Sequence, residues 1–326
     1  MTDKLRWGLL STAHINRAVI PPLKTSKRNL LVAVASRTLE KAQKYASEWK
    51  IEKSLGSYEE LLADPQIDVI YNSLPNSMHA EWTVKALEAG KHVLCEKPMT
   101  TTLEDMDAII RASQKTGKVA AEAFMYRHHP QTLKVRELVA AGEIGKVVMM
   151  RGIFTFRLTN MADVRMDPAL GGGSIWDLGC YPISYARSIY AQEPEVLFGR
   201  QVLSKSGVDA VFSGEMYFPG EVLAQVQCSF RSPRFTRFEV FGDQGRLIIT
   251  EPFIPSPKEN IIVVHGDSQK EIAIESGDLY AGEIEDMADV ILEHKAQRIS
   301  LADSRNNVRA ILGLLESARS GNPVKF

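Results

Sequence analysis

The first third of the chain alternates short apolar runs with amphipathic stretches, and this alternation is the strongest constraint on the fold. Apolar runs rich in β-prone residues occupy residues 5–10, 30–35, 67–74, 92–95 and 118–124. Stretches with helical spacing separate them; one ends at Gly90, and another opens with a capping box from Thr102 to Asp105. Strands and helices in this order predict an α/β fold with a parallel, doubly wound Rossmann sheet.

The chain has 326 residues, which is enough for two domains of about 100–200 residues each. The alternation stops at residue 124, so residues 1–124 are expected to form a dinucleotide-binding domain. Residues 125–326 then form an α+β domain for substrate binding and oligomerisation. Its β-prone runs between residues 196 and 264 predict an open, largely antiparallel sheet. Two helical stretches close the chain, and the C-terminal helix could pack back on the first domain.

Composition excludes several classes of protein. The net charge of -1 provides no basic field for nucleic acid, and no run approaches eighteen consecutive apolar residues. The Met1-Thr2-Asp3 start lacks the apolar run of a signal peptide. Three well-separated cysteines, Cys95, Cys180 and Cys228, indicate neither a disulfide framework nor a zinc site. We therefore expect a cytoplasmic protein with no nucleic-acid or membrane partner.

The turn after the first predicted strand is where a Rossmann sheet normally binds its cofactor. In register with the G-x-G-x-x-G pattern, the three glycines are replaced by Ser11, Ala13 and Asn16. Small residues at Ser11, Thr12 and Ala13 still let the backbone approach a pyrophosphate at the start of the next helix. His14 and Ile15 complete this cofactor-binding turn, although His14 could equally be an ordinary residue at a helix start.

The second predicted strand ends in Ser36-Arg37-Thr38, where an NAD-specific site would carry an acidic residue for the ribose hydroxyl. An arginine between two hydroxyl side chains suits a 2′-phosphate instead. This pattern favours NADP(H), with NAD(H) as the other option. The alternative for Arg37 is a solvated side chain beside a helix start.

A buried strand ends on charged residues at Glu96-Lys97-Pro98. Open α/β sheets bind ligands at the carboxyl ends of their strands, so Lys97 could project into a crevice and act on a substrate oxygen. Pro98 restricts the backbone at Lys97 and would help to fix the direction of its side chain. An ordinary surface Lys-Pro turn is the alternative.

A glycine loop in the second half precedes another candidate site. Three glycines lead to Ser174, predicted to be the N-cap of a helix on which Asp177 and Tyr181 share a face. A plain polar helix face would look the same. Arg165, upstream of the loop, could contact substrate or form a surface ion pair. The paired histidines His128 and His129 lack carboxylates at ligand spacing, so no metal is expected.

Five motifs along the chain occur together and in order in a known family. They are the variant glycine turn at residues 8–15, Leu74-Pro75-Asn76 with His79, Glu96-Lys97-Pro98, Tyr126-Arg127-His128-His129-Pro130, and Gly171-Gly172-Gly173 followed by Asp177 and Tyr181. This combination resembles the glucose-fructose oxidoreductase/inositol dehydrogenase (Gfo/Idh/MocA) family over essentially the whole chain. Within that family it looks most like NADP-dependent aldose dehydrogenases of the D-xylose type and dimeric dihydrodiol dehydrogenases.

The resemblance implies a nicotinamide lying over Lys97, with Tyr181 and Asp177 nearby. Tyr181 would exchange the proton with the reacting hydroxyl, Lys97 would hold the oxygen and lower the pKa of the tyrosine, and Asp177 would orient the substrate. Lys97 as the direct proton carrier is the alternative. Further cofactor contacts implied by the resemblance are Leu74, Pro75, Asn76, His79, Glu96 and Pro98. Candidate substrate contacts are Tyr126, Arg127, His129, Phe156, Arg165 and Trp176.

The expected reaction is oxidation of a neutral sugar, D-xylose or D-glucose, at C1. Alternatives are NADPH-dependent reduction of a keto-sugar or dicarbonyl, oxidation of a trans-dihydrodiol, and NAD-dependent glycoside cleavage on the same fold. A homodimer is expected, or else a homotetramer, because one face of the second sheet needs cover. In the run 221–230, that face would carry either Val222, Ala224, Val226 and Cys228 or the alternating set.

Overall fold

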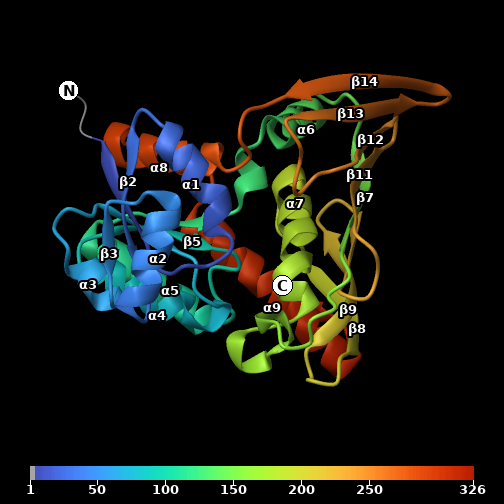
Figure 1. The fold of residues 1–326 in the computed structure, drawn as a ribbon. Helices are drawn as coiled ribbons and strands as arrows, with labels where there is room; N and C mark the ends of the chain where they lie inside the picture. The colour runs from blue at the N-terminus through green and yellow to red at the C-terminus, as the bar shows by residue number, and fades with distance from the viewer. Residues whose placement is uncertain (1–3) are drawn as a thin grey trace. The chain divides into compact units, whose positions relative to one another are not determined.

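The computed structural model describes residues 4–326, which form two compact units (Figure 1). The first unit contains residues 4–125 together with Tyr280–Arg305. The second contains Tyr126–Leu279 and Asn306–Phe326. The start of the chain at Met1-Thr2-Asp3 lies outside the described residues. No helix among residues 4–326 has the length and apolar character needed to cross a bilayer.

The first unit is a six-stranded, wholly parallel sheet in the order β3-β2-β1-β4-β5-β6. Helices α1, α2 and α8 bury one apolar face of this sheet, and α3, α4 and α5 bury the other. The prediction of a doubly wound Rossmann sheet is confirmed. The elements are β1 (Leu5–Leu9), α1 (Asn16–Thr25), β2 (Asn29–Ala35), α2 (Leu39–Trp49), β3 (Lys53–Leu55), α3 (Tyr58–Ala63), β4 (Val69–Asn72), η1 (Asn76–Met78), α4 (His79–Glu88), β5 (His92–Glu96), α5 (Leu103–Thr116), β6 (Ala120–Ala123) and α8 (Ala281–Glu293).

Five strands of this sheet were predicted from the sequence, and the sixth is the short edge strand β3. Its three residues are all half-buried, so it shows neither the apolar run of a central strand nor clear alternation. It pairs with β2 through Ala33 opposite Lys53. The strand predicted at residues 118–124 is also shorter than expected, since β6 covers only Ala120–Ala123.

The second unit contains a nine-stranded sheet in the order β14-β13-β12-β11-β7-β10-β9-β8-β15. Only the β7–β10 pair is parallel, so the expected largely antiparallel sheet is confirmed. Helix α9 (Leu301–Ser320) begins in the first unit and ends in the second. The other elements are η2 (Met125–His128), α6 (Pro130–Ala140), β7 (Val147–Thr155), η3 (Val164–Met166), η4 (Pro168–Leu170), η5 (Ile175–Gly179), α7 (Cys180–Tyr190), β8 (Val196–Leu203), β9 (Asp209–Phe218), β10 (Val222–Ser229), β11 (Phe235–Gly242), β12 (Arg246–Ile249), β13 (Lys258–His265), β14 (Ser268–Glu275) and β15 (Val324–Lys325).

Helix α7 packs on β7 and β10, and this packing defines the inner face of the second sheet. Val222, Ala224, Val226 and Cys228 all lie on the inner face and are at most 2% exposed. The opposite face of β10 therefore carries the alternating set Leu223, Gln225 and Gln227, each of them half-buried. Strand β14, which forms the long hairpin with β13 visible in Figure 1, was not predicted, because most of its residues are polar and exposed.

Candidate functional site

The predicted cofactor residues of the first unit all lie at or after the carboxyl ends of adjacent strands. The turns begin after β2, β1, β4 and β5, which are neighbours in that order. In an open parallel sheet this edge is where ligands bind. The structure therefore brings together the four groups of residues predicted to hold the cofactor: Ser11, Thr12, Ala13, His14 and Ile15; Ser36, Arg37 and Thr38; Leu74, Pro75, Asn76 and His79; Glu96, Lys97 and Pro98.

Lys97 lies directly after β5, and the neighbouring strand fixes the residue that precedes it. The Tyr71 hydroxyl donates a hydrogen bond to Glu96 Oε1, and the Lys97 amide is 3.3 Å from Glu96 Oε2. Tyr71 is fully buried; burial, with Glu96 beside it, raises the pKa of its phenol well above the ordinary value. The phenol therefore stays protonated and keeps donating to Glu96 at neutral pH.

His79 and Glu122 anchor the residues that follow Lys97. The buried His79 ring lies between two carbonyl oxygens, with Nδ1 2.8 Å from Pro98 O and Nε2 2.7 Å from Leu74 O. Glu122 on β6 accepts a hydrogen bond of 2.9 Å from the Met99 amide. His79 would therefore act on a cofactor indirectly, by holding the two turns that it joins. Burial lowers the pKa of its imidazole.

Asn16, at the third glycine position, has a buried side chain that ties two of these turns together. Its Nδ2 donates to Ser11 O at 2.8 Å, and its Oδ1 accepts from Ser73 Oγ at 2.7 Å. Ser73 Oγ is in turn 2.8 Å from Ser11 Oγ. This network replaces the tight packing that a glycine provides and links the turn after β1 to the turn after β4. The sequence showed that Asn16 was not glycine but gave no sign of Ser73 as its partner.

The start of α1 suits an anion. Helix α1 has no acidic residue in its first turn, and within the described chain no side chain caps it. The positive end of its dipole therefore points towards the Ser11–Ile15 turn without a competing carboxylate. Thr38 does cap α2, with Oγ1 accepting from the Lys41 amide at 3.4 Å, and leaves Arg37 exposed just before that helix.

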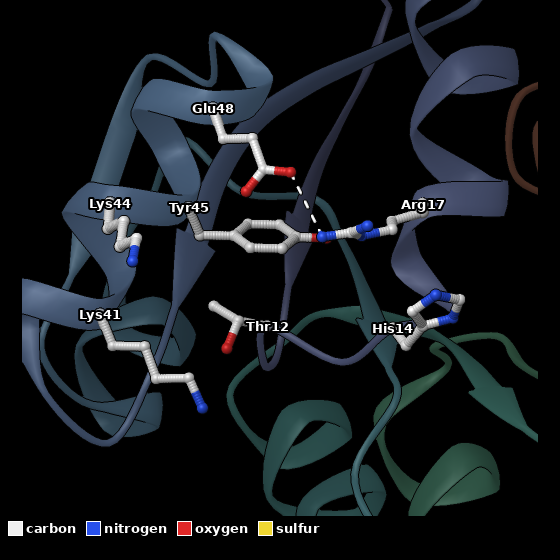
Figure 2. Close-up of a pocket in the computed structure, with 7 residues that line it drawn as sticks. All are labelled: Thr12, His14, Arg17, Lys41, Lys44, Tyr45 and Glu48. Atoms are coloured by element: carbon white, nitrogen blue, oxygen red, sulfur yellow. Dashed lines mark hydrogen bonds and ion pairs between the residues drawn. The ribbon is translucent and has the colours of Figure 1, made fainter.

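A pocket of about 350 Å³ lies between the turn after β1 and helix α2 (Figure 2). It combines three cationic side chains with one carboxylate, and Arg17 pairs with that carboxylate, Glu48, at 3.3 Å. The excess of positive charge favours an anionic ligand group. Thr12 and His14 were predicted from the sequence. The lining residues on the helices were missed, although Lys41 and Lys44 are three apart and so share a face of α2. The lining residues are Thr12, His14, Arg17, Lys41, Lys44, Tyr45 and Glu48.

The prediction of a regular helix capped by Ser174 was wrong. Residues Ile175–Gly179 form a π-helical turn, which runs directly into α7 at Cys180. Ser174 does not cap the turn, because its hydroxyl donates to Asp209 Oδ2 at 2.6 Å. Asp177 lies in the π-helical turn, a geometry that occurs frequently at functional sites.

Asp177 is held in place by Arg165. Arg165 Nε donates to Asp177 Oδ2 at 2.7 Å, and its Nη1 lies 3.2 Å from Asp163 Oδ1. The Asp177 carboxylate raises the pKa of Arg165, and this effect outweighs burial, which lowers that pKa. The guanidinium also lies 5.9 Å from the ring centre of Phe156. Arg165, Phe156 and Asp177 therefore share one region of the second unit, as a substrate site there would require.

Tyr181 lies in a cluster of aromatic rings in the second unit. Its ring centre is 5.6 Å from that of Tyr126, 5.5 Å from that of Phe154 and 5.7 Å from that of Phe253. The Tyr126 hydroxyl donates to Tyr181 O at 3.4 Å. Only 5% of Tyr181 is exposed, so the packing leaves its ring little freedom to change rotamer.

Three of the remaining predicted substrate residues are buried in this unit. Arg127 Nη1 donates to Ser184 Oγ at 3.0 Å. His129 caps α6 by accepting from the Gln131 amide, and its other ring nitrogen is 2.7 Å from Ser276 Oγ. Trp176 is 7% exposed. Among residues 4–326, no group of three or more His, Cys, Asp and Glu side chains is arranged to hold a metal ion.

Comparison with known proteins agrees with this architecture. Residues 5–124 match a model described as the oxidoreductase family with an NAD-binding Rossmann fold, and residues 132–248 match the GFO/IDH/MocA C-terminal domain. The fold and these matches define a dinucleotide-binding oxidoreductase. The chain belongs to the Gfo/Idh/MocA family, as its motifs predicted.

Two curated relatives and one solved structure illustrate the range of the family. D-xylose 1-dehydrogenase (NADP(+)) 2 of Haloferax volcanii is 35% identical over 327 residues, covering 99% of this chain and all of the relative. Trans-1,2-dihydrobenzene-1,2-diol dehydrogenase of Xenopus laevis is 31% identical over 268 residues, covering 81% and 80% of the two chains. A 3-ketoreductase from Actinomadura kijaniata, solved with NADP and TDP-benzene, superimposes with a TM-score of 0.92 at 26% identity and covers 97% of this chain and 98% of its own.

Proposed function

We propose that this protein is an NADP(H)-dependent oxidoreductase that oxidises a neutral aldopyranose at C1 to its lactone, with D-xylose and D-glucose as the first substrates to test. The observation that carries this proposal is the similarity to a D-xylose 1-dehydrogenase along 99% of the chain. The NADP-bound structure of the 3-ketoreductase supports the cofactor.

The charges on the first unit also favour a phosphorylated cofactor. Arg37 is exposed at the end of β2, where a ribose 2′ substituent lies in Rossmann folds. Lys41 and Lys44 line the nearby pocket, and Glu48 is already paired with Arg17. A 2′-phosphate could bind to several cationic side chains there. A 2′-hydroxyl would have no carboxylate to accept its hydrogen bond, because position 37 is an arginine.

Three side chains are assigned to the reaction. Tyr181 exchanges the proton with the reacting hydroxyl, and Lys97 holds the same oxygen and favours the ionised tyrosine through its positive charge. Asp177 accepts a hydrogen bond from a second substrate hydroxyl, in the orientation that Arg165 fixes. The bound nicotinamide supplies the hydride chemistry. Direct proton transfer by Lys97 is the alternative assignment.

The surroundings of Asp177 favour a neutral substrate. Arg165 is the cation next to Asp177, and its positive charge is offset by both Asp163 and Asp177. Arg127 is only 5% exposed and bonds to Ser184. A substrate carboxylate or diphosphate would have to break such pairs, whereas sugar hydroxyls can bond to the carboxylates already present.

A panel of free aldoses, trans-dihydrodiols and keto-sugars, each assayed in both directions with NADP(H) and NAD(H), tests the substrate. The proposal expects NADP⁺-linked oxidation of D-xylose or D-glucose. Activity confined to a nucleotide-linked keto-sugar would instead favour the second candidate, a ketoreductase, which the structural similarity to the 3-ketoreductase supports.

We also propose a homodimer formed through the outer face of the second sheet, with a homotetramer as the next candidate. Tyr217 and Phe235 on this face are 44% and 49% exposed, which is high for large apolar side chains. Light scattering at micromolar concentration should give twice the chain mass, and a monomer would refute the proposal. A cytoplasmic location is supported by Cys95, Cys180 and Cys228, which are buried as reduced thiols, as expected in a reducing compartment.

A further inference from the structure

The buried acid Asp209 has no role in the reaction proposed above, yet it contacts the segment that carries Asp177. Asp209 is the first residue of β9 and is 4% exposed. Its Oδ2 accepts two hydrogen bonds, from Ser174 Oγ at 2.6 Å and from the Ile175 amide at 2.8 Å. A strand on the sheet thereby holds the start of the π-helical turn. The partners are 34 and 35 residues apart, so no local sequence pattern reveals the contact.

Glycine at position 173 makes this contact possible. Gly173 has φ of +129°, and a Cβ added there would lie 2.4 Å from Asp209 Oδ1. A side chain would therefore displace the carboxylate from the turn. The last glycine of the Gly171-Gly172-Gly173 loop thus provides close approach to an acid as well as an unusual backbone conformation.

The surroundings of Asp209 are mostly uncharged. Cys228 on β10 has its sulfur 3.4 Å from Ser174 Oγ, and the other titratable groups in this region are Asp177 and Cys180. Burial raises the pKa of Asp209 to about 6, against the effect of its hydrogen-bond donors. The group is thus mainly a carboxylate at pH 7, and its bonds to the hydroxyl and the amide are charge-assisted.

We propose that Asp209 is a positioning residue for the active site. By fixing Ile175, it sets the position of the π-helical turn. This turn carries Asp177 two residues later and runs into α7, whose second residue is Tyr181. The effect on turnover rests on the proposed function of Asp177 and Tyr181, whereas the structural contact does not depend on it. A misplacement of about 1 Å can cost about 100-fold in rate, so a modest loosening of this turn would be measurable.

Trp176 gives a direct measure of this positioning, because it lies in the π-helical turn beside Gly173. The other three tryptophans of the chain, Trp7, Trp49 and Trp82, belong to the first unit. Fluorine NMR of protein labelled with 5-fluorotryptophan would therefore report the turn through one signal and the first unit through three. Trp176→Phe assigns the signal.

The test compares Asp209→Ala with Asp209→Asn and with a control, Ser317→Ala. Ser317 is a fully buried polar anchor of the same unit, bonded to Gly199 N at 3.0 Å and to Asn322 O at 2.6 Å. Asp209→Ala should shift or broaden only the Trp176 signal and lower kcat about 10- to 100-fold with unchanged NADPH affinity. Asp209→Asn keeps an oxygen acceptor and should retain more activity. Ser317→Ala should lower the unfolding temperature without either effect.

An unchanged Trp176 signal in Asp209→Ala would overturn the inference, and so would wild-type kcat in that variant. If the unmutated protein turns over none of the panel substrates, the proposed function fails instead. The Trp176 signal then still decides whether Asp209 holds the turn.

Discussion

At the scale of single residues, Arg37 is proposed to set the preference between cofactors. A charge-assisted contact to a 2′-phosphate is worth roughly 1.5–3 kcal/mol, or about 10- to 100-fold in affinity. Arg37→Asp should therefore raise the KM for NADP⁺ by that factor and reverse the preference towards NAD⁺. Lys27→Asp, a charge reversal at another exposed site of the same unit, is the control and should leave the preference unchanged. Equal KM values for both cofactors in the unmutated protein would show that Arg37 has no such role.

Lys97 and Tyr181 should matter for turnover far more than for cofactor binding. Both are proposed to act on the oxygen whose charge changes in the transition state, and loss of general acid–base catalysis costs about 10²–10⁴-fold. Lys97→Met and Tyr181→Phe should lower kcat within that range, while NADPH titration gives near-normal affinity. Tyr190→Phe is the matched control, because Tyr190 lies on the same helix and bonds to Pro219 O at 2.7 Å. Near-normal turnover of Tyr181→Phe would assign the proton to Lys97 or Asp177.

The residues that bear the candidate chemistry could be named from local sequence, but their supports could not. Lys97 and Arg37 stand at the ends of recognisable strands, where a charge needs an explanation. Ser73 and Glu122 gave no signal of their own, because their partners Asn16 and Met99 lie 57 and 23 residues away. Such contacts depend on which strands become neighbours, and that order is a property of the folded sheet.

At the scale of elements, the turn between β1 and α1 depends on Asn16. Removing this fully buried amide would take away the donor to Ser11 O and the acceptor of the Ser73 hydroxyl, at a cost of about 1–3 kcal/mol. Asn16→Ala should lower the free energy of unfolding by that amount and also weaken NADPH binding. Asn29→Ala provides a comparison, because Asn29 is a buried amide of the same unit that bonds to Trp7 at 2.8 Å. If both variants weaken NADPH binding equally, the effect of Asn16 is general and not specific to the turn.

Elements with strong periodicity were predicted correctly, and weakly patterned ones were missed. The central strands β1, β2, β4 and β5 are nearly continuous apolar runs, and the capping box at Thr102 marks the start of α5. Strand β3 is short and β14 is mostly polar, so neither has a sequence pattern that predicts a strand. Each is an edge strand that pairs with the neighbouring strand of its sheet. The π-helical turn was read as a regular helix start because Ser174 resembles an N-cap, whereas its hydroxyl bonds to Asp209.

At the scale of the whole molecule, His92 should make stability depend on pH. Its Nδ1 accepts a hydrogen bond from the Val119 amide at 3.0 Å, and burial, reinforced by Lys118, lowers the pKa of the imidazole to about 4. The unfolded chain takes up this proton near pH 6.5 and the folded chain only near pH 4, so stability is full above pH 6.5 and falls as the pH drops through that window. The loss from His92 should reach at most about 2 kcal/mol between pH 6.5 and pH 5.

Chemical denaturation at pH 7 and pH 5 measures this loss. His92→Asn retains an acceptor for Val119 but cannot titrate, so it should show a smaller decrease in the free energy of unfolding than the unmutated protein. His294→Asn removes an exposed histidine and should behave like the unmutated protein. The same decrease in all three proteins would rule out His92 as a source of the pH dependence.

The central claim is that the protein transfers hydride between a sugar and NADP(H), and absorbance at 340 nm tests it most directly. With NADP⁺ and D-xylose or D-glucose, the account predicts a steady rise as NADPH accumulates, faster than with NAD⁺ at the same concentration. The contradicting result is an unchanged absorbance with every free aldose while a nitrophenyl glycoside is cleaved. That result would mean that the fold uses its cofactor for hydrolysis without net oxidation.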